Sequence, residues 1–162
     1  MVIEIMSALK LLNYTQSSHN ENAAVISISN YGEEFVDVRN NPKNGIEALC
    51  QVHFNDVEAE MRNCMTDRDA ANIASFVKEV SEKKDRLIVQ CGYGVSRSAG
   101  VAAAILMHLT GNDSEIWRNP KYRPNITCYR KMMTAFHEVI DEQELKLKVA
   151  VNRRYYVWAD DN

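Results

Sequence analysis

The chain has 162 residues, 46% of them hydrophobic and 25% charged, with a formal net charge of −3 at pH 7. These values are typical of an ordinary globular protein and predict a single domain over residues 1–162 with a core of its own. The small acidic excess argues against nucleic acid as a partner, because nucleic-acid binders usually carry a basic excess. No stretch approaches about 18 uninterrupted apolar residues, so we expect no membrane span and no membrane partner.

The N-terminal stretch and the cysteines bear on the compartment. The stretch MVIEIMSALKLL lacks a basic leader and carries Glu4 within its apolar run, which makes it a poor signal peptide. The four cysteines, Cys50, Cys64, Cys91 and Cys128, include no C-x-x-C pair. Without an export signal they predict free thiols in a reducing compartment, and therefore a cytoplasmic location. The pattern gives no indication of the oligomeric state.

Two strands are expected in the first third of the chain. Residues 13–22 are polar and are predicted to form a loop. Residues 23–29, AAVISIS, are predicted to form a buried strand. The alternating residues 49–54, LCQVHF, favour a further strand, which would deliver Asn55 and Asp56 to a sheet edge.

A helix, a third strand and a second helix are expected next. Thr66 is a candidate N-cap for a helix that begins at Asp67, whose apolar residues recur three and four positions apart. Residues 87–89 are short and β-branched enough to be a buried strand. An Ala-rich helix is predicted over residues 96–109, with Gly111 as its C-terminal cap.

The last third of the chain is predicted to be a loop and a helix. Residues 112–125 contain two prolines and are expected to be mostly loop, with one short helical turn near Trp117. Asn125 is a candidate cap for a final helix whose apolar stripe extends to Ile140. The tail from about Glu144 fits a strand or a continued helix. Strands alternating with helices favour an α/β fold with a central, mostly parallel sheet flanked by helices.

Residues 87–107, LIVQCGYGVSRSAGVAAAILM, carry the strongest chemical signal. A strand, a glycine turn and a helix gather backbone N–H groups at a helix N-terminus, which is a ready site for an anion. Gly92 and Gly94 let the backbone approach a ligand and tolerate positive φ. Cys91 is a nucleophile at the strand end, and Arg97, six residues later, is a bidentate cation. This combination points to phosphate-monoester chemistry.

Cleavage of a phosphate ester by a cysteine needs a thiolate, donors for the phosphate oxygens and an acid for the leaving group. A helix N-terminus and a guanidinium favour the Cys91 thiolate, and the Ser98 hydroxyl can stabilise it when it leaves in a second step. The acid must come from another loop. The predicted phosphate-binding residues are Gly92, Tyr93, Gly94, Val95, Ser96 and Arg97.

Residues 90–98, QCGYGVSRS, resemble the H-C-x-x-G-x-x-R-[ST] signature of the cysteine-dependent protein tyrosine and dual-specificity phosphatases. The match covers Cys91, Gly94, Arg97 and Ser98 without a gap, and the small dual-specificity type is the more similar. The resemblance implies a phosphotyrosine protein phosphatase-like fold and a reaction through a cysteinyl-phosphate. It also implies that no cofactor and no metal take part, because Arg97 and the backbone amides neutralise the charge.

Two further segments bear on this resemblance. Residues 123–125, Arg-Pro-Asn, followed by Tyr129, resemble the segment that braces the phosphate loop in that family. Asn125 and Gln90 are therefore expected to support the loop. Gln90 stands where the family usually has His, and it can donate a hydrogen bond but cannot carry charge. We expect an active enzyme in which the Cys91 thiolate is less well supported.

The general acid is not part of the motif. By resemblance it is an Asp on a loop some thirty to forty residues before the nucleophile. Asp56 lies 35 residues before Cys91, directly after a predicted strand, and is our first choice. Asp67 and Asp69 are rivals, although their positions fit the first turn of a helix.

The sequence therefore predicts a cysteine-dependent phosphatase of phosphotyrosine in proteins or peptides, with phosphoserine and phosphothreonine as further candidate substrates. Two alternatives stay open. The first is a phosphate-binding module with little turnover, which Gln90 leaves possible. The second is a phosphatase whose substrate is a small phosphorylated metabolite, a lipid or an RNA 5′ end.

Overall fold

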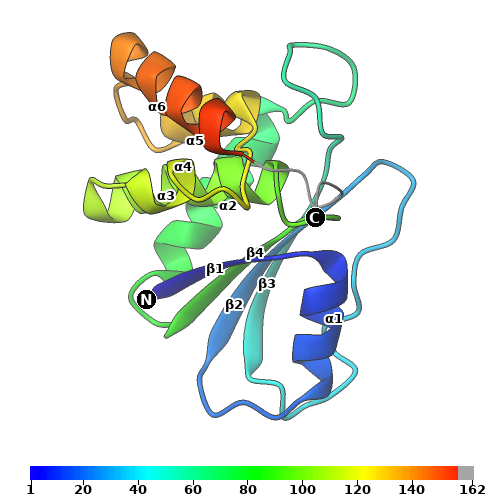
Figure 1. The fold of residues 1–162 in the computed structure, drawn as a ribbon. Helices are drawn as coiled ribbons and strands as arrows, with labels where there is room; N and C mark the ends of the chain where they lie inside the picture. The colour runs from blue at the N-terminus through cyan, green and yellow to red at the C-terminus, as the bar shows by residue number, and fades with distance from the viewer. Residues whose placement is uncertain (157–162) are drawn as a thin grey trace.

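The computed structural model describes residues 1–156 and contains a four-stranded, all-parallel sheet with the strand order β1-β4-β2-β3 (Figure 1). The predicted α/β fold with a mostly parallel sheet is confirmed. Residues 157–162 of the predicted domain lie outside the described residues. The strands are Val2–Met6 (β1), Ala23–Ser29 (β2), Ile46–His53 (β3) and Arg86–Gln90 (β4). The helices are Ala8–Gln16 (α1), Asp67–Val80 (α2), Arg97–Thr110 (α3), Ser114–Trp117 (α4), Ile126–Ala135 (α5) and Glu142–Tyr155 (α6).

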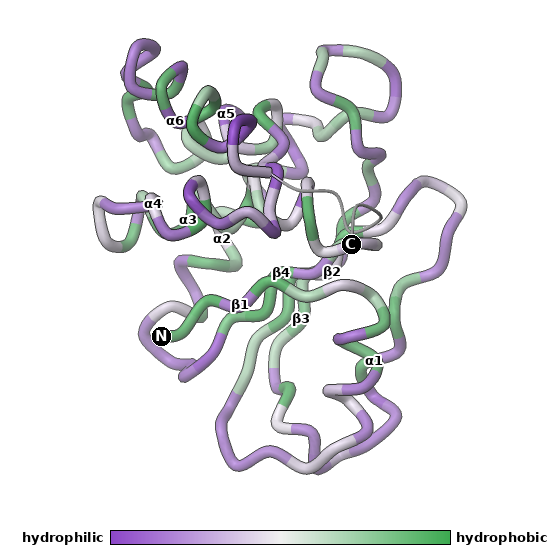
Figure 2. Tube along the Cα trace, viewed as in Figure 1, coloured by the Kyte–Doolittle hydropathy of each residue, from purple (hydrophilic) through white to green (hydrophobic). Residues whose placement is uncertain are grey.

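Both faces of the sheet are covered, and alternate side chains of each strand enter two different cores. Leu87 and Val89 of β4 pack in the larger core with residues of α2, α3 and α5. Ile88 points to the opposite face and packs in a smaller core with Leu11 of α1 and Val38 of the β2–β3 connection. Figure 2 shows the matching pattern, with hydrophobic colour in the strands and hydrophilic colour in the connecting loops. This two-sided burial explains the continuous apolar runs of β2 and β4.

The connections of the sheet bring the ends of three strands together. The chain moves from β1 to β2 through α1, and it moves in the opposite direction across the sheet from β3 to β4 through α2. Because parallel crossovers are right-handed, these two helices must lie on opposite faces, as Figure 1 shows. Because the strands are parallel, the segments that follow β2, β3 and β4 emerge at the same edge of the sheet. In parallel sheets this carboxyl edge is where ligands bind.

Several predicted elements are confirmed. Strand β2 has the predicted bounds. Helix α2 begins at Asp67 with a capping box, in which Thr66 and Asp69 satisfy each other's backbone N–H groups. Helix α3 ends at Gly111, which adopts φ of 75° as its left-handed cap. In residues 1–156, no helix is long and apolar enough to cross a membrane.

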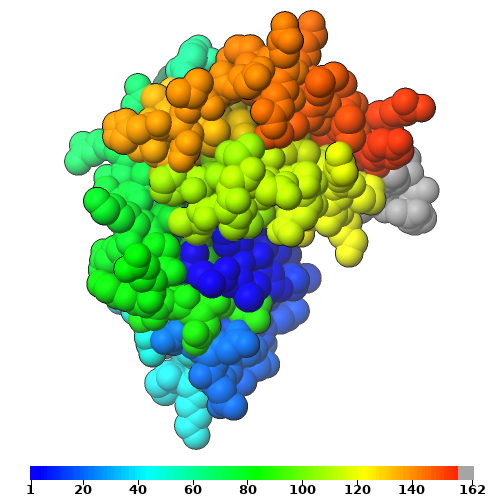
Figure 3. All heavy atoms as spheres, turned by 90° about the vertical axis from the view of Figure 1, so that its left-hand side faces the viewer, coloured from blue at the N-terminus to red at the C-terminus, as the bar shows by residue number. Residues whose placement is uncertain are grey.

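The N-terminal region corrects one prediction. Residues 13–16 are not loop but the last part of α1, which Ser7 caps by accepting a hydrogen bond from the Lys10 N–H at 3.1 Å. The helix is short and buries only Leu11 and Thr15 fully, so its periodicity in sequence is weak. The strand before it, β1, was not predicted because it lies at the edge of the sheet. In Figure 3 this dark-blue strand is visible at the surface below the yellow-green α3.

The C-terminal region corrects a second prediction. Helix α5 ends at Ala135 rather than near Ile140, and His137 adopts φ of 58°, which breaks the helix. The ambiguous tail is helical. Asp141 caps α6 by accepting hydrogen bonds from two backbone N–H groups, and the helix runs on to Tyr155. The apolar stripe up to Ile140 that suggested one long helix therefore belongs to α5 and to the turn that follows it.

The contacts of Gly94 give a test of this fold. Gly94 has φ of +69°, and a Cβ there would lie 2.6 Å from the Ser7 nitrogen and 2.8 Å from the Met6 carbonyl carbon. Gly111 has a similar φ of +75°, but a Cβ there meets nothing within 4 Å. We expect Gly111→Ala to lower the free energy of unfolding by about 1 kcal/mol and Gly94→Ala by about 2–4 kcal/mol, as measured by urea denaturation. Equal losses would show that the approach of β1 to residue 94 is not tight.

Candidate active site

The segment from Cys91 to Arg97 joins β4 to α3 and is held along its first half by the β1–α1 junction. The Cys91 N–H donates to the Met6 carbonyl at 3.3 Å, and the Gly92 carbonyl accepts from the Ala8 N–H at 3.0 Å. Of the two loop glycines only Gly94 has positive φ, so the tolerance of glycine for positive φ is used at Gly94 and not at Gly92. The loop is thus shaped by one left-handed residue that packs against backbone.

The second half of the loop is braced from the segment before α5. The Val95 carbonyl accepts from the Arg123 N–H at 3.0 Å, and the Ser96 carbonyl accepts from the Asn125 N–H at 3.0 Å. These are backbone contacts of the Arg-Pro-Asn stretch that the sequence marked as a brace. Tyr129 lies apart from this contact, where its hydroxyl donates to Asp113 at 2.9 Å.

The predicted nucleophile is buried against a hydroxyl. The Cys91 Sγ lies 3.1 Å from the Ser98 Oγ, and the two residues are 3% and 0% exposed. A hydroxyl can donate to a thiolate, so this contact can stabilise the negative sulfur. It depends on the first turn of α3, which places Ser98 over the end of β4.

Arg97 is a buried guanidinium with unused hydrogen-bonding capacity. The residue is 6% exposed, and its Nη1 donates to the Asn30 Oδ1 at 2.7 Å and to the Phe54 carbonyl at 2.8 Å. Its Nε is buried and has no partner. Within residues 1–156, no carboxylate forms an ion pair with Arg97. A buried charge without a counterion is unfavourable by itself, so this arrangement is typical of a site for an anion.

Asp56 lies beside the loop and is held by two donors. Its Oδ1 accepts from the Ser96 Oγ at 2.8 Å and from the Asn125 Nδ2 at 2.8 Å. Asp56 itself is exposed, and its Oδ2 makes no hydrogen bond with any described residue. Because the Ser96 hydroxyl bonds to Asp56, it does not cap α3, and the amides at the start of that helix stay free of a side-chain cap.

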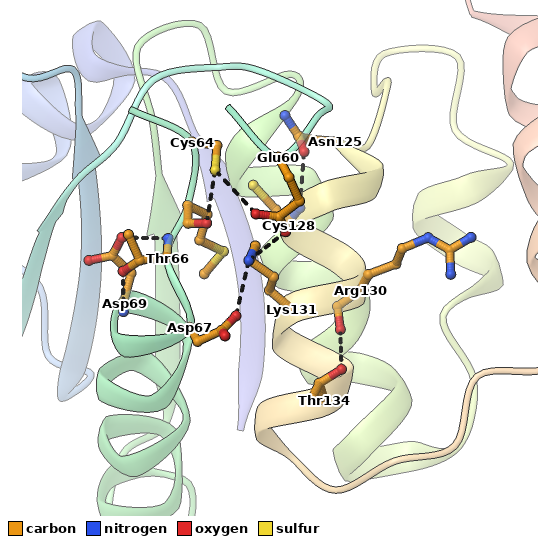
Figure 4. Close-up of polar contacts among 11 residues, drawn as sticks. Glu60, Cys64, Thr66, Asp67, Asp69, Asn125, Cys128, Arg130, Lys131 and Thr134 are labelled. Atoms are coloured by element: carbon orange, nitrogen blue, oxygen red, sulfur yellow. Dashed lines mark hydrogen bonds and ion pairs between the residues drawn. The ribbon is translucent and has the colours of Figure 1, made fainter. Parts of the chain in front are cut away.

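The segment that carries Asp56, residues 54–65, is fastened at further points. Figure 4 shows Lys131 of α5 reaching both Glu60 of this segment and Asp67 of α2, at 2.7 and 3.0 Å. Arg153 of α6 bonds Glu58 at 3.0 Å. These contacts cross three helices and fix the segment close to the loop.

The two rival carboxylates have other contacts. Asp67 is paired with Lys131, and Asp69 completes the capping box of α2 with Thr66 (Figure 4). Asp56 is the one of these three that bonds to the loop, through Ser96. The geometry therefore favours Asp56 over Asp67 and Asp69 as the candidate general acid.

Gln90, Ser27 and Asn30 lie next to the loop at the ends of β4 and β2, and no sequence motif marks Ser27 or Asn30. Gln90 Oε1 accepts from the Ser27 Oγ at 2.6 Å, and these two buried residues are register partners in β4 and β2. Asn30, which directly follows β2, holds Arg97. Its position at a strand end was the only signal in the sequence, because the partner lies 67 residues away.

A cavity of about 300 Å³ opens beside the loop. Its walls include Gly92, Tyr93 and Arg97 on one side and Glu33 and Phe35 of the β2–β3 connection on the other. The Tyr93 side chain is 90% exposed, so it projects away from the phosphate loop. In residues 1–156, no cluster of three His, Cys, Asp or Glu side chains could hold a metal ion.

Known structures share this architecture. No family model and no curated protein matches the sequence. Human DUSP28 is similar with a TM-score of 0.58 and 17% identity, over 90% of this chain and 94% of that chain. A mouse putative dual specificity phosphatase, complexed with zinc tungstate, is similar with a TM-score of 0.53 and 18% identity, over 92% and 86%. PTPMT1 is similar with a TM-score of 0.52 and 14% identity, over 92% and 94%.

The chain has the dual-specificity phosphatase fold. On this fold six of the predicted site residues divide into two groups. Side chains or backbone of five converge on the loop: Cys91, Arg97, Ser98, Asp56 and Asn125. Gln90 is bonded to Ser27 of β2 and lines the cavity beside Arg97.

The anion site can be tested by alkylation with iodoacetate, which is itself an anion. Burial raises the pKa of Cys50 to about 11 and that of Cys128 well above its ordinary value, so few of these thiols are ionised at pH 7. Cys91, beside the unpaired Arg97, is expected to be labelled first, and inorganic phosphate is expected to slow that labelling. Peptide mapping by mass spectrometry measures both effects. Labelling of Cys50 first, or no protection by phosphate, would contradict this assignment.

Proposed function

We propose that this chain is a cysteine-dependent phosphatase that hydrolyses phosphotyrosine in proteins or peptides. The observation that carries the proposal is the buried Arg97, which has no carboxylate partner among the described residues and follows Cys91 in the same strand-to-helix loop, where Cys91 contacts Ser98. The phosphate dianion is the ligand that such a guanidinium and a helix N-terminus bind together. The proposed domain covers residues 1–162 and works in the reducing cytoplasm with its thiols free.

In the first step, the Cys91 thiolate attacks phosphorus in line with the leaving oxygen. An S–P bond forms, the P–O ester bond breaks, and the proton of the Asp56 carboxyl passes to the leaving oxygen. The free Oδ2 of Asp56 suits this role, because Ser96 and Asn125 hold only its Oδ1. Arg97 and the amides of residues 92–97 bind the three other phosphate oxygens, so charge is neutralised without a metal or cofactor.

In the second step, water hydrolyses the cysteinyl-phosphate. The Asp56 carboxylate takes a proton from the water as its oxygen bonds to phosphorus, the S–P bond breaks, and inorganic phosphate is released. The Ser98 hydroxyl, 3.1 Å from the sulfur, stabilises the departing Cys91 thiolate.

The proposed substrate is an aromatic phosphate ester on a protein, with phosphoserine and phosphothreonine as further substrates. An aromatic ring packs well on an apolar side chain next to a phosphate site, and Phe35 of the β2–β3 connection lines the cavity that Arg97 also lines.

Hydrolysis of p-nitrophenyl phosphate in EDTA tests the nucleophile. The wild type is expected to turn over, and Cys91→Ser is expected to lose at least about 10³-fold in kcat, because an un-ionised hydroxyl is a far weaker nucleophile than a thiolate. Cys128→Ser, at a buried thiol outside the loop, is the matched control and should keep its turnover. Full activity in Cys91→Ser would remove Cys91 as the nucleophile.

The leaving-group dependence tests the acid. Asp56→Asn keeps an oxygen for Ser96 and Asn125 but has no proton to give, so hydrolysis of phenyl phosphate should fall by about 10²–10⁴-fold. Hydrolysis of an activated aryl phosphate, whose leaving group needs no proton, should fall much less. Asp69→Asn serves as control and should preserve the wild-type ratio of the two rates. An unchanged ratio in Asp56→Asn would place the acid elsewhere.

A second candidate function is a phosphate-binding module with little turnover. One observation favours it: Gln90 is bonded to Ser27 and carries no charge that could support a thiolate. A human "tyrosine phosphatase-like serine/threonine/tyrosine-interacting protein" is also similar in fold, with a TM-score of 0.51 and 16% identity over 78% of this chain and 80% of that chain. Binding of vanadate by a wild type that does not turn over would support this candidate over the enzyme.

A further inference from the structure

The cavity beside the loop has an acidic wall. Glu33 and Glu34, both exposed residues of the β2–β3 connection, line it on the side opposite Gly92 and Arg97. Arg97 is the only cationic residue among the described residues that line this cavity. Two carboxylates therefore share the cavity with a single guanidinium.

Arg97 marks this cavity as a place for a ligand independently of the two glutamates. It is 6% exposed, and its buried Nε has no hydrogen-bond partner. In the proposed function a phosphate dianion takes up the charge of this guanidinium. Glu33 and Glu34 are then like charges next to a dianion, which disfavours binding unless the ligand itself supplies a cation.

Glu33 is held close to Arg97. Its backbone N–H donates to the Asn30 carbonyl at 3.1 Å, and its Oε1 accepts from the Asn30 Nδ2 at 3.1 Å. The Oδ1 of the same amide accepts from the Arg97 Nη1 at 2.7 Å. One amide thus separates the carboxylate from the guanidinium, which places them within about one Debye length (~8 Å) at physiological ionic strength. The charge of Glu33 therefore acts on any ligand of Arg97.

The chain does not neutralise this wall itself. Within residues 1–156, neither the Glu33 nor the Glu34 carboxylate forms an ion pair. The cation in the first turn of α1, Lys10, is paired with Glu4. Arg39 belongs to the same connection as the two glutamates but does not line the cavity. The compensating charge is therefore left for the substrate to bring.

We infer that Glu33 and Glu34 are specificity-determining residues, which select phosphorylated peptide segments with Lys or Arg next to the phosphorylated residue. The inference rests on the proposed function and names its substrate class. A basic side chain pairs with the two carboxylates while the phosphate binds Arg97, so the charges of ligand and cavity are complementary. Acidic peptides, phosphorylated lipids and RNA 5′ ends add negative charge to the same cavity and are disfavoured.

Three phosphotyrosine peptides test the selection. They differ only in the two residues that flank the phosphotyrosine, which are both Arg, both Gln or both Glu, and phosphate release gives kcat/KM for each. We expect the wild type to prefer the Arg peptide over the Glu peptide by about 10-fold, because an exposed ion pair contributes a factor of about 1.5–5. Raising NaCl from about 0.05 M to about 0.5 M should reduce this ratio by screening.

The double variant Glu33→Gln/Glu34→Gln removes both charges and keeps an oxygen at residue 33 for Asn30. Its Arg-to-Glu ratio should fall to about twofold, with a slower Arg peptide and a faster Glu peptide. Added to Cys91→Ser, the two substitutions should strengthen the calorimetric binding of inorganic phosphate, because two like charges are gone. A merely structural role would lower all three peptide rates and the phosphate affinity together.

Glu79→Gln is the matched control. It removes the same charge from the last turn of α2, which leads to the start of β4 and hence lies at the opposite edge of the sheet. Its Arg-to-Glu ratio should stay that of the wild type.

Three results would overturn the inference while wild-type turnover leaves the proposed phosphatase standing. They are equal kcat/KM for the three peptides, an unchanged ratio in the double variant, and faster turnover of a soluble phosphatidylinositol phosphate than of the Arg peptide. A wild type that hydrolyses none of the substrates would overturn the proposed function. The affinities of the Cys91→Ser chain for the three peptides then decide the inference: tightest binding of the Arg peptide supports it, and equal or absent binding overturns it.

Discussion

The uncompensated charge of Arg97 is the constraint on which the site depends. Burying a guanidinium without a carboxylate is unfavourable, and the structure offsets this only in part, through the Asn30 amide and the Phe54 carbonyl. These two acceptors stand at the ends of β2 and β3, while Arg97 itself begins the helix after β4. The position of the charge therefore requires three neighbouring parallel strands in their present order.

The segment that carries the proposed acid, Asp56, extends the same arrangement to the helical side of the molecule. Ser96 and Asn125 hold Asp56 from the loop and from the start of α5, and Lys131 and Arg153 hold the rest of its segment from α5 and α6. Asn125 also caps α5 through its side-chain oxygen, so one residue serves the helix, the loop and the acid. Arg97, the proposed nucleophile Cys91 and the proposed acid Asp56 are thus held by contacts from several elements rather than by one motif.

Local sequence signals were sufficient where structure depends on near neighbours. The strand over 23–29, the Thr66 cap and the Gly111 cap follow from residues within one turn or one strand of each other. Local sequence signals failed where an element is only partly buried or where an apolar stripe is interrupted by a turn. Edge strand β1 and short helix α1 show little periodicity, and the turn at His137 divides an apolar stripe that looked continuous.

The sequence by itself determined that Cys91, Gly94, Arg97 and Ser98 lie within one strand-to-helix turn, and it predicted the chemistry that we propose for this loop. It also pointed to Asp56 by its place after a strand. Only the tertiary structure decided which carboxylate reaches the loop and which groups accept hydrogen bonds from Arg97. Asp56 and Asn30 lie 40 and 67 residues from their partners Ser96 and Arg97, and only the parallel register of β2, β3 and β4 brings them together.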